Sequence, residues 1–432
     1  MKNLAQNAFH KTLAAIDIRA ALERRLDRQG SMIRAGDQAI DLRGFETILG
    51  IAYGKASFAM ADGFRTILAP DFAVEGILVA PATPSRPLPQ WQTFAGGHPI
   101  PSEGSFAAGR AILDRLARCD EKTLVVFLLS GGGSAMVEQP LDPAISLDAF
   151  QALNAALVTC GADIDEINTV RKHLSATKGG RLAAAAPRSM KVTLAISDVP
   201  GGHESTLASG PTVPDPSTIF DAERVAQAWG LAARLPPSLR ATFERHRLTE
   251  TPKDGDPAFA RSLFVCLLNM HDLFHAAHHA CEAEGFVCIC DDATDGWPIE
   301  RAADALLAQL AAHKKANPHH RVAVIADGEL SCPVTGDGLG GRNSAFVLAC
   351  AQKIAGKDIT VLSAGTDGID GNSPAAGAVA DGGTLARAER AGLAAEDFAK
   401  RSDAYSFFER LGDAIVTGPT GNNLRDLRIL MA

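Results

Sequence analysis

The amino-acid sequence predicts an α/β protein with two domains and a mainly parallel sheet. Short apolar runs recur along the chain, and most end at a glycine or another turn residue. Alanine-rich stretches with helical spacing separate these runs, and strands that alternate with helices form βαβ units. The chain has 432 residues, whereas a single hydrophobic core stops growing near roughly 250–300 residues, so two domains are expected.

The first half of the chain contains the clearest strand and helix patterns. Residues 1–30 carry apolar side chains at near-helical spacing and are predicted to be helical. The apolar runs predict strands at residues 47–52, 76–80, 123–129 and 191–196. The alanine-rich stretches predict helices at residues 109–118, 147–159 and 180–186.

A change of composition marks the expected domain boundary. Residues 211–260 hold many of the prolines and a polar stretch, which is typical of a linker. We therefore place a larger domain at residues 1–250 and a smaller one at residues 251–432. The smaller domain is predicted to contain strands at residues 262–268, 286–289, 321–325 and 359–364, and helices at residues 272–284, 298–313 and 343–354.

The composition argues against several classes of protein. A formal net charge of −8 is unfavourable for a general nucleic-acid binder, although a local basic cleft could hold a small anion. Eight cysteines without a CxxC pair suggest reduced thiols and a cytoplasmic location. We expect neither a signal peptide nor a membrane span, because no sufficiently long apolar run occurs.

The strongest local signal is a glycine run directly after the predicted strand 123–129. It consists of Ser130, Gly131, Gly132, Gly133 and Ser134. Such a turn exposes consecutive N–H groups at a positive helix end, which suits a phosphate or a carboxylate. A simple tight turn is the alternative, but three glycines exceed what a turn needs. We expect this run to bind a nucleotide.

Two cationic residues occupy similar glycine-rich turns. Lys55 lies in a turn that resembles a phosphate-binding P-loop, but the spacing is one residue short and Ala56 replaces the Ser or Thr that would hold magnesium. Gly340 and Gly341 precede Arg342, which opens a predicted helix and could fork onto phosphate oxygens. We expect these two glycines to contact the nucleotide as well. A solvated lysine and a flexible loop are the alternatives.

Three aspartates follow predicted strands. Asp367 and Asp370 lie in one glycine-rich loop and could hold Mg²⁺ directly or through water. Local turns stabilised by the aspartate side chains are the alternative. Asp198 follows the strand 191–196, at the edge of a parallel sheet where ligands usually bind.

A basic run and a histidine cluster complete the candidates. Arg171, Lys172 and Lys178 could bind an acidic substrate, although such a run is more often a solvated surface. His275 and His279 are four residues apart on a predicted helix, as zinc ligands can be. No HExxH motif occurs, so a polar helix face is the favoured interpretation.

Long strings along nearly the whole chain resemble the type II glycerate kinase family, whose C-terminal half carries the MOFRL region. The strings occur in family order at Gly54-Lys55-Ala56, Gly96-Gly97-His98-Pro99 and residues 129–135, 167–182, 196–216, 340–343, 364–370, 376–379 and 417–421. The resemblance implies a larger, Rossmann-like N-terminal α/β domain and a smaller α/β C-terminal domain. It also implies an active site in the cleft between the domains.

The same resemblance implies ATP- and Mg²⁺-dependent phosphorylation of D-glycerate, usually giving 2-phosphoglycerate. The family's functional lysine and arginine match Lys55 and Arg342. Members have often been labelled hydroxypyruvate reductase. This chain departs from the family pattern at residues 202–203, 326–327 and 422–425, which leaves the nucleotide and substrate contacts open.

These observations combine into one mechanistic hypothesis, in which positioning and charge neutralisation catalyse phosphoryl transfer. Lys55 and Arg342 would approach the transferring phosphate, and the basic run would hold the glycerate carboxylate. Asp198 or Asp367 would accept the substrate proton or hold Mg²⁺. We favour Asp198 for the proton and Asp367, with Asp370, for the metal. An NAD(P)H-dependent hydroxypyruvate reductase, a kinase for a related sugar acid and a non-catalytic sensor are the alternatives. The oligomeric state stays open, with a homodimer among the alternatives.

Overall fold

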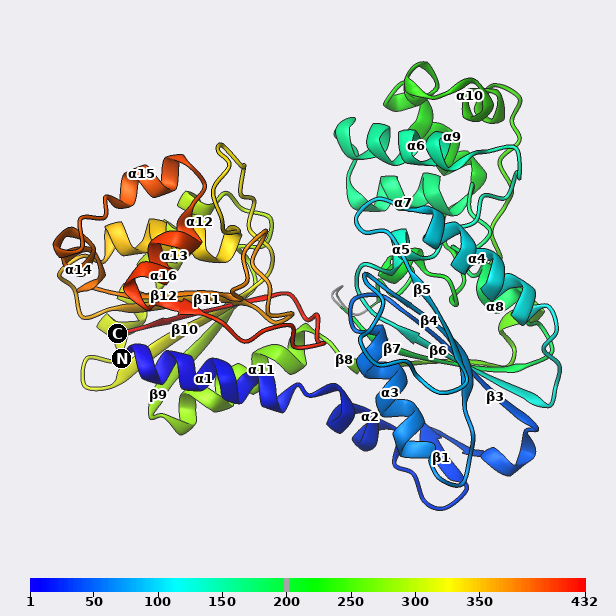
Figure 1. Cartoon of the computed structure of the whole chain (residues 1–432), viewed down its shortest axis with the longest axis horizontal. Helices are drawn as coiled ribbons and strands as arrows, with labels where there is room; N and C mark the ends of the chain where they lie inside the picture. Colours follow the sequence, from blue (N-terminus) through cyan, green and yellow to red (C-terminus); the bar gives the residue numbers. More distant parts are fainter. Residues whose placement is uncertain (198–201) are drawn as a thin grey trace. The chain divides into compact units, whose positions relative to one another are not determined.

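The computed structural model of the chain describes residues 1–197 and 202–432. The chain forms two compact units (Figure 1). One unit is Ile18–Leu267, and the other joins Met1–Asp17 to Leu268–Ala432. Each unit is built on a six-stranded sheet, so the predicted α/β class with a mainly parallel N-terminal sheet is confirmed.

The sheet of the Ile18–Leu267 unit has the strand order β5-β4-β3-β6-β7-β8. Its strands are β3 (Thr47–Tyr53), β4 (Glu75–Ala80), β5 (Trp91–Ala95), β6 (Thr123–Leu129), β7 (Met190–Ile196) and β8 (Ser262–Leu268). The pairings from β5 through β7 are all parallel. The carboxyl ends of these strands therefore meet at one edge of the sheet, where the loops 54–56, 96–102 and 130–134 begin.

Helices cover both faces of this sheet. The helices are α2 (Ile18–Leu26), α3 (Ser57–Leu68), α4 (Glu103–Leu116), α5 (Gly133–Met136), α6 (Leu147–Thr159), α7 (Ile164–Lys172), α8 (Arg181–Ala184), α9 (Ile219–Ala228) and α10 (Pro237–Glu244). Side chains alternate along β3 and β6, and one set packs with α4, α5 and α8 in a common core. Helices α6, α7, α9 and α10 form a separate helical cluster around their own apolar core (Figure 1). A short antiparallel hairpin, β1 (Met32–Ala35) and β2 (Gln38–Asp41), completes the unit.

The second unit contains a mixed sheet with the order β13-β12-β11-β14-β10-β9. Its strands are β9 (Phe286–Asp291), β10 (Arg321–Asp327), β11 (Thr360–Gly365), β12 (Gly377–Asp381), β13 (Ala414–Ile415) and β14 (Asp426–Met431). Only β9 and β10 pair in parallel, and the other neighbours pair antiparallel. The C-terminal strand β14 thus lies in the centre of the sheet.

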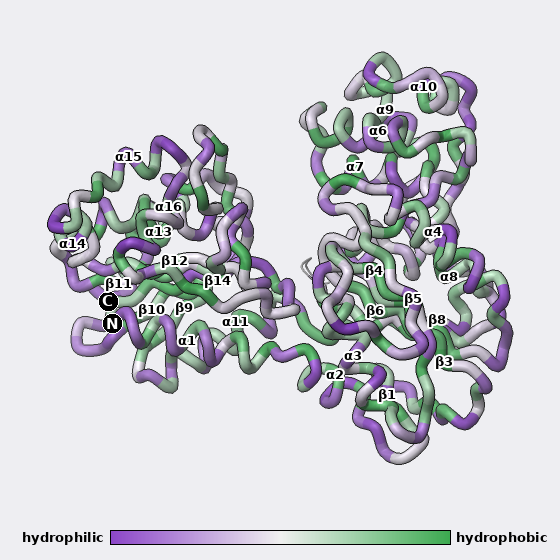
Figure 2. Tube along the Cα trace, in the orientation of Figure 1, coloured by the Kyte–Doolittle hydropathy of each residue, from purple (hydrophilic) through white to green (hydrophobic). Residues whose placement is uncertain are grey.

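The helices of this unit also lie on two faces. They are α1 (Lys2–Ala15), α11 (Met270–Ala283), α12 (Ile299–Ala316), α13 (Arg342–Lys353), α14 (Thr384–Arg390), α15 (Ala395–Lys400) and α16 (Ala404–Leu411). Helix α1 packs beside α11 on one face, and α12, α13 and α16 bury the opposite face. The strands of both sheets are the most hydrophobic segments of the chain, and polar residues concentrate on the outer helices and loops (Figure 2). This distribution is the one expected for two layered cores.

The division of the chain differs from the expected boundary at residue 250. Strand β8 is hydrogen-bonded into the first sheet, so the proline-rich residues 211–260 lie within that unit and do not link two domains. The N-terminal segment was expected in the first domain, but α1 packs on α11 in the second unit. A division of the sequence at a single boundary could not place the N-terminal helix in the same unit as the C-terminal residues.

Most predicted elements appear close to their expected positions, with three kinds of difference. The expected helix over residues 1–30 is two helices separated at Ile16 and Asp17. Helix α4 begins earlier than expected because Ser102 caps it, accepting a hydrogen bond from the Ser105 N–H. The strands β1, β2, β5, β12, β13 and β14 and the helices α7, α9, α10, α14, α15 and α16 were not anticipated.

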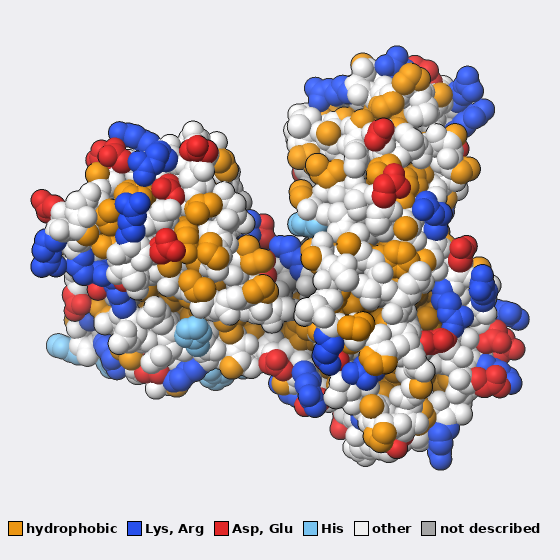
Figure 3. Space-filling view, viewed as in Figure 1, with side chains coloured by type: hydrophobic (Ala, Val, Ile, Leu, Met, Phe, Trp, Pro, Cys, Tyr) orange, Lys and Arg blue, Asp and Glu red, His pale blue; other side chains and the backbone are white. Residues whose placement is uncertain are grey.

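None of the described helices is long and apolar enough to cross a bilayer. On the face shown in Figure 3, basic and acidic side chains are interspersed over both units. All eight cysteines are free thiols.

Candidate functional site

The turns after β3 and β6 lock together at the carboxyl edge of the first sheet. Gly54 has a φ of 117°, and a side chain there would collide with Ser130. The buried Ser130 hydroxyl accepts a hydrogen bond from the Ala56 N–H at 3.0 Å. The Lys55 N–H donates to the Gly131 carbonyl at 3.0 Å. Two segments that the sequence singled out separately therefore form one structure.

The glycine run is held open at the end of β6. Gly132 has a φ of 82°, and a methyl group on Gly133 would lie 2.9 Å from the Tyr53 ring. Within the described residues, no acceptor is found for the N–H groups of Gly131, Gly132 and Gly133. These N–H groups are suited to bind an anion, as expected. The side chains of Ser130 and Ser134, which were expected to contact the nucleotide, make hydrogen bonds within the protein. The Ser130 hydroxyl bonds the neighbouring turn, and the Ser134 hydroxyl bonds the Ser209 hydroxyl at 2.9 Å.

His98 lies beside the same glycine and was not assigned a role from the sequence. A methyl group on Gly132 would lie 3.0 Å from Cδ2 and 3.2 Å from Nε2 of His98, and 3.4 Å from Cγ of Lys55. Partial burial, then the charge of Lys55, lowers the pKa of His98. Gly96-Gly97-His98 contributed to the family resemblance, but the sequence indicated no chemical role for His98, and the short strand β5 before it was not predicted.

Lys178 is a structural residue, contrary to its predicted substrate role. Its side chain is 2% exposed and pairs with the carboxylate of Glu138 at 2.8 Å. Its ammonium also donates to the carbonyls of Ser134 at 2.7 Å and Val137 at 3.1 Å. The ammonium is therefore engaged by two hydrogen bonds and one ion pair inside the protein. Lys178 fixes the chain that leaves the glycine run.

Lys172 is also buried, and its partner is Asp215 at 3.1 Å. Asp215 further accepts hydrogen bonds from Ser217 and Thr251. This network ties α7 to the segment after residue 210, so Lys172 does not face a ligand.

Arg171 is the member of the basic run that keeps its binding capacity. Its Nε atom is buried and has no hydrogen-bond partner among the described residues. Burial lowers its pKa, and the charge of Glu138 opposes this shift. A buried guanidinium without a bonded carboxylate is a good receptor for a small acid.

In the second unit, Asp370 caps helix α13. Its carboxylate accepts hydrogen bonds from the N–H groups of Gly341, Asn343 and Ser344 at 3.1, 2.9 and 2.8 Å. The Ser344 hydroxyl adds a fourth bond at 2.6 Å. Burial raises the pKa of Asp370 against the effect of these bonds. Three of these bonds reach one carboxylate oxygen and one reaches the other, so the cap competes with the predicted metal role, which stays a prediction.

Gly340 and Gly341 are explained by the same cap. The Gly340 N–H donates to the Asn372 side chain at 2.9 Å, and the Gly341 N–H donates to Asp370. A side chain on Gly341 would collide with Asp370. Their N–H groups are therefore not available to a nucleotide, which corrects the expected phosphate contact.

Arg342 is the first residue of α13 and is held by two carboxylates. Its Nε bonds Asp426 at the start of β14, and its terminal nitrogen lies 2.9 Å from Glu329. These partners raise the pKa of Arg342 above its ordinary value despite partial burial, which lowers it. The side chain remains 34% exposed, so the fixed guanidinium can still meet a ligand.

Comparisons with known proteins cover the whole chain. A domain of unknown function, DUF4147, matches residues 4–244, and the MOFRL family matches residues 322–426. The D-glycerate 2-kinase of Thermotoga maritima is 34% identical over 92% of this chain and 93% of its own. The chain belongs to the type II glycerate kinase family.

Other family members support this placement. A putative hydroxypyruvate reductase of Agrobacterium vitis is 38% identical over 88% of this chain and 86% of its own. The crystal structure of the Thermotoga maritima glycerate kinase matches with a TM-score of 0.84 and 31% identity, and covers 100% of this chain and 99% of that one. The predicted family and fold are thus confirmed.

The remaining predicted site residues are two aspartates. Asp367 is half-buried, and one carboxylate oxygen accepts the Ile369 N–H at 3.0 Å, as in the local turn considered from the sequence. Asp198 lies outside the described residues, so its role stays a prediction. Among the residues that the structure does describe, no three His, Cys, Asp or Glu side chains are placed together to hold a metal ion.

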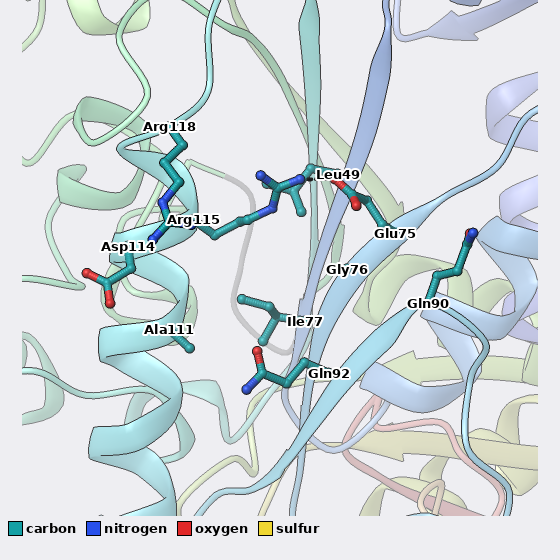
Figure 4. Close-up of a pocket in the computed structure, with 10 residues that line it drawn as sticks. All are labelled: Leu49, Glu75, Gly76, Ile77, Gln90, Gln92, Ala111, Asp114, Arg115 and Arg118. Atoms are coloured by element: carbon teal, nitrogen blue, oxygen red, sulfur yellow. Dashed lines mark hydrogen bonds and ion pairs between the residues drawn. The ribbon is translucent and has the colours of Figure 1, made fainter.

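Two pockets lined by described residues lie away from the residues expected from the family. One of about 360 Å³ is lined by Glu75, Gln90, Gln92, Asp114 and Arg115 (Figure 4). Glu75 begins β4, so this pocket lies at the amino edge of the sheet, opposite the glycine run. A second cavity of about 570 Å³ borders α11, where Nε2 of His275 and Nε2 of His279 are 3.2 Å apart.

Proposed function

We propose that this protein transfers the terminal phosphoryl group of ATP to the 2-hydroxyl of D-glycerate, giving 2-phosphoglycerate. The observation that carries the proposal is the full-length match to enzymes named D-glycerate 2-kinase. The site of the first unit supports it, because Lys55 borders a glycine run whose N–H groups have no acceptor among the described residues.

Each cation of the proposal has a distinct task. The N–H groups of Gly131, Gly132 and Gly133 bind nucleotide phosphates, and Lys55 neutralises the charge of the transferring group. Arg171 binds the glycerate carboxylate, because its guanidinium is largely desolvated and has an unbonded Nε. Arg342, in the other unit, matches the functional arginine of the family, and its two carboxylate partners fix its orientation.

The described residues could supply few ligands to Mg²⁺, so most of its ligands would be phosphate oxygens of the nucleotide and water. Magnesium in kinases is commonly held by one or two carboxylates together with substrate phosphates, where it neutralises charge. Asp367 is the predicted carboxylate that fits this position better, since four hydrogen bonds already engage Asp370 as the cap of α13. The proposed site is therefore one aspartate plus phosphate oxygens.

The decisive experiment is NMR of the product formed from D-glycerate, ATP and Mg²⁺. The proposal predicts 2-phosphoglycerate and a stoichiometric release of ADP. The label of the Agrobacterium vitis relative raises hydroxypyruvate reduction as the second candidate, and NADH consumption with hydroxypyruvate tests it in a parallel reaction. Reductase activity without phosphorylated product would overturn the kinase proposal.

A further inference from the structure

His98 borders the glycine run that is proposed to bind the nucleotide phosphates. It follows β5, and its ring edge borders Gly132 on the same side as the Lys55 side chain. The proposed phosphate contacts are Lys55 and the N–H groups of this glycine run. A hydroxyl that attacks a phosphorus atom bound there therefore has a histidine within its surroundings.

The loop that carries His98 is anchored at both ends. Gly96 packs so closely on Met136 that a methyl group there would lie 2.7 Å from the Met136 Cβ. The Gly97 N–H donates to the Ser105 hydroxyl at 3.0 Å, and Ser102 caps α4. Residues 96–102 are thus fixed to the glycine run on one side and to α4 on the other, which holds the imidazole in place.

The ring is exposed and available for proton transfer. His98 is solvent-exposed, and none of the described residues makes a hydrogen bond with its ring nitrogens. The charged group that acts on it among the described residues is Lys55 from the β3–α3 turn, while the glycine run contributes none. Partial burial and the charge of Lys55 lower its pKa, which favours the neutral imidazole that a general base requires.

We infer that His98 is the general base of the reaction, an inference that rests on the proposed function. The glycerate O–H bond breaks and its proton moves to a ring nitrogen of His98. The glycerate oxygen bonds to the terminal phosphorus of ATP, and the bond from that phosphorus to the bridging oxygen breaks. The electron pair of that bond leaves with ADP. Asp198, which the sequence suggested for this proton, is the competing group.

The test compares His98→Gln, His98→Gly and the matched control His319→Gln, which changes an exposed histidine in the other unit. General base catalysis contributes typically about 10²–10⁴-fold. His98→Gln should therefore lose about that much kcat, with similar KM values and circular dichroism. The acidic limb of the wild-type kcat/KM profile should disappear. Added imidazole should restore activity to His98→Gly but not to His98→Gln.

Several outcomes would overturn the inference. If wild type phosphorylates glycerate and His98→Gln keeps the acidic limb, His98 has only a structural role. If Asp198→Asn removes that limb and His98→Gln does not, the aspartate is the base. If wild type forms no phosphoglycerate, the proposed function fails together with this inference, and the wild-type assay alone reveals it.

Discussion

Replacing Lys178 with methionine tests whether this lysine stabilises the folded structure or binds the substrate. Methionine fills a similar volume but leaves the carboxylate of Glu138, which is 0% exposed, without its counter-charge. It also removes the bonds to the carbonyls of Ser134 and Val137. Removing one partner of a buried ion pair costs about 3–5 kcal/mol. We expect Lys178→Met to lower the free energy of unfolding of the Ile18–Leu267 unit by that amount.

The assay must resolve one unit of a two-unit chain, because such a chain need not unfold in one step. Hydrogen exchange of peptides from β6 and α5, measured beside urea unfolding, localises the loss. The double variant Lys178→Met with Glu138→Gln should recover part of the stability, since a neutral amide is less costly to bury. The matched variant Arg171→Met should keep stability and raise the KM for glycerate. A Lys178→Met protein with wild-type stability and a raised KM for glycerate would refute this reasoning.

Three further predictions concern other residues of the two units. Lys55→Ala and Arg342→Ala should each abolish ADP release with glycerate while circular dichroism stays unchanged, and near-wild-type turnover in either would contradict its role. Asp370→Asn should loosen the start of α13 by about 1–3 kcal/mol, because an amide cannot accept all four bonds; faster hydrogen exchange at residues 341–346 would show this. Burial raises the pKa of Asp327 from 3.8 to about 6. A pKa difference of this size corresponds to about 3 kcal/mol in the free energy of unfolding. The protonated carboxyl stabilises the folded state fully below pH 4, and this contribution is lost as the pH rises through 6. The free energy of unfolding, measured by chemical denaturation from pH 4 to 7, should therefore fall with pH in the wild type and fall less in Asp327→Asn.

The sequence predicted the strands well where burial on both faces makes them continuous apolar runs. β3 and β6 are buried along almost their whole length and were located within one residue. β14 was missed because Arg428 interrupts its apolar pattern. That arginine is fully buried, and its guanidinium donates to the carbonyls of Asp327 and Gly328. Only the fold supplies the acceptors that make an arginine acceptable in a central strand.

The glycine run and Lys55 could be predicted because turn chemistry is local. The basic run could not be divided into structural and binding residues, because its partners lie far along the chain. Lys178 pairs with a carboxylate 40 residues before it, and Lys172 with Asp215, 43 residues after it. Arg171 lies beside Lys172 in the sequence and has no such partner for its Nε within the described part of the chain.

Asp327 and Arg425, two residues at which this chain departs from the family pattern, form an ion pair in the second unit. Asp327 is buried, and its nearest cation is Arg425, whose terminal nitrogen lies 3.8 Å from the carboxylate. Arg425 also pairs with Asp295 in the loop after β9. Burying an ionised carboxyl group without a cation would cost stability. Burial raises the pKa of Asp327 even though the charges of Arg425 and Arg428 lower it. The arginine at 425 is therefore the electrostatic counterpart of the aspartate at 327, so the two departures act as a pair within this unit. Substituting Arg425 alone would leave two acidic side chains to repel each other, whereas changing both positions together would not.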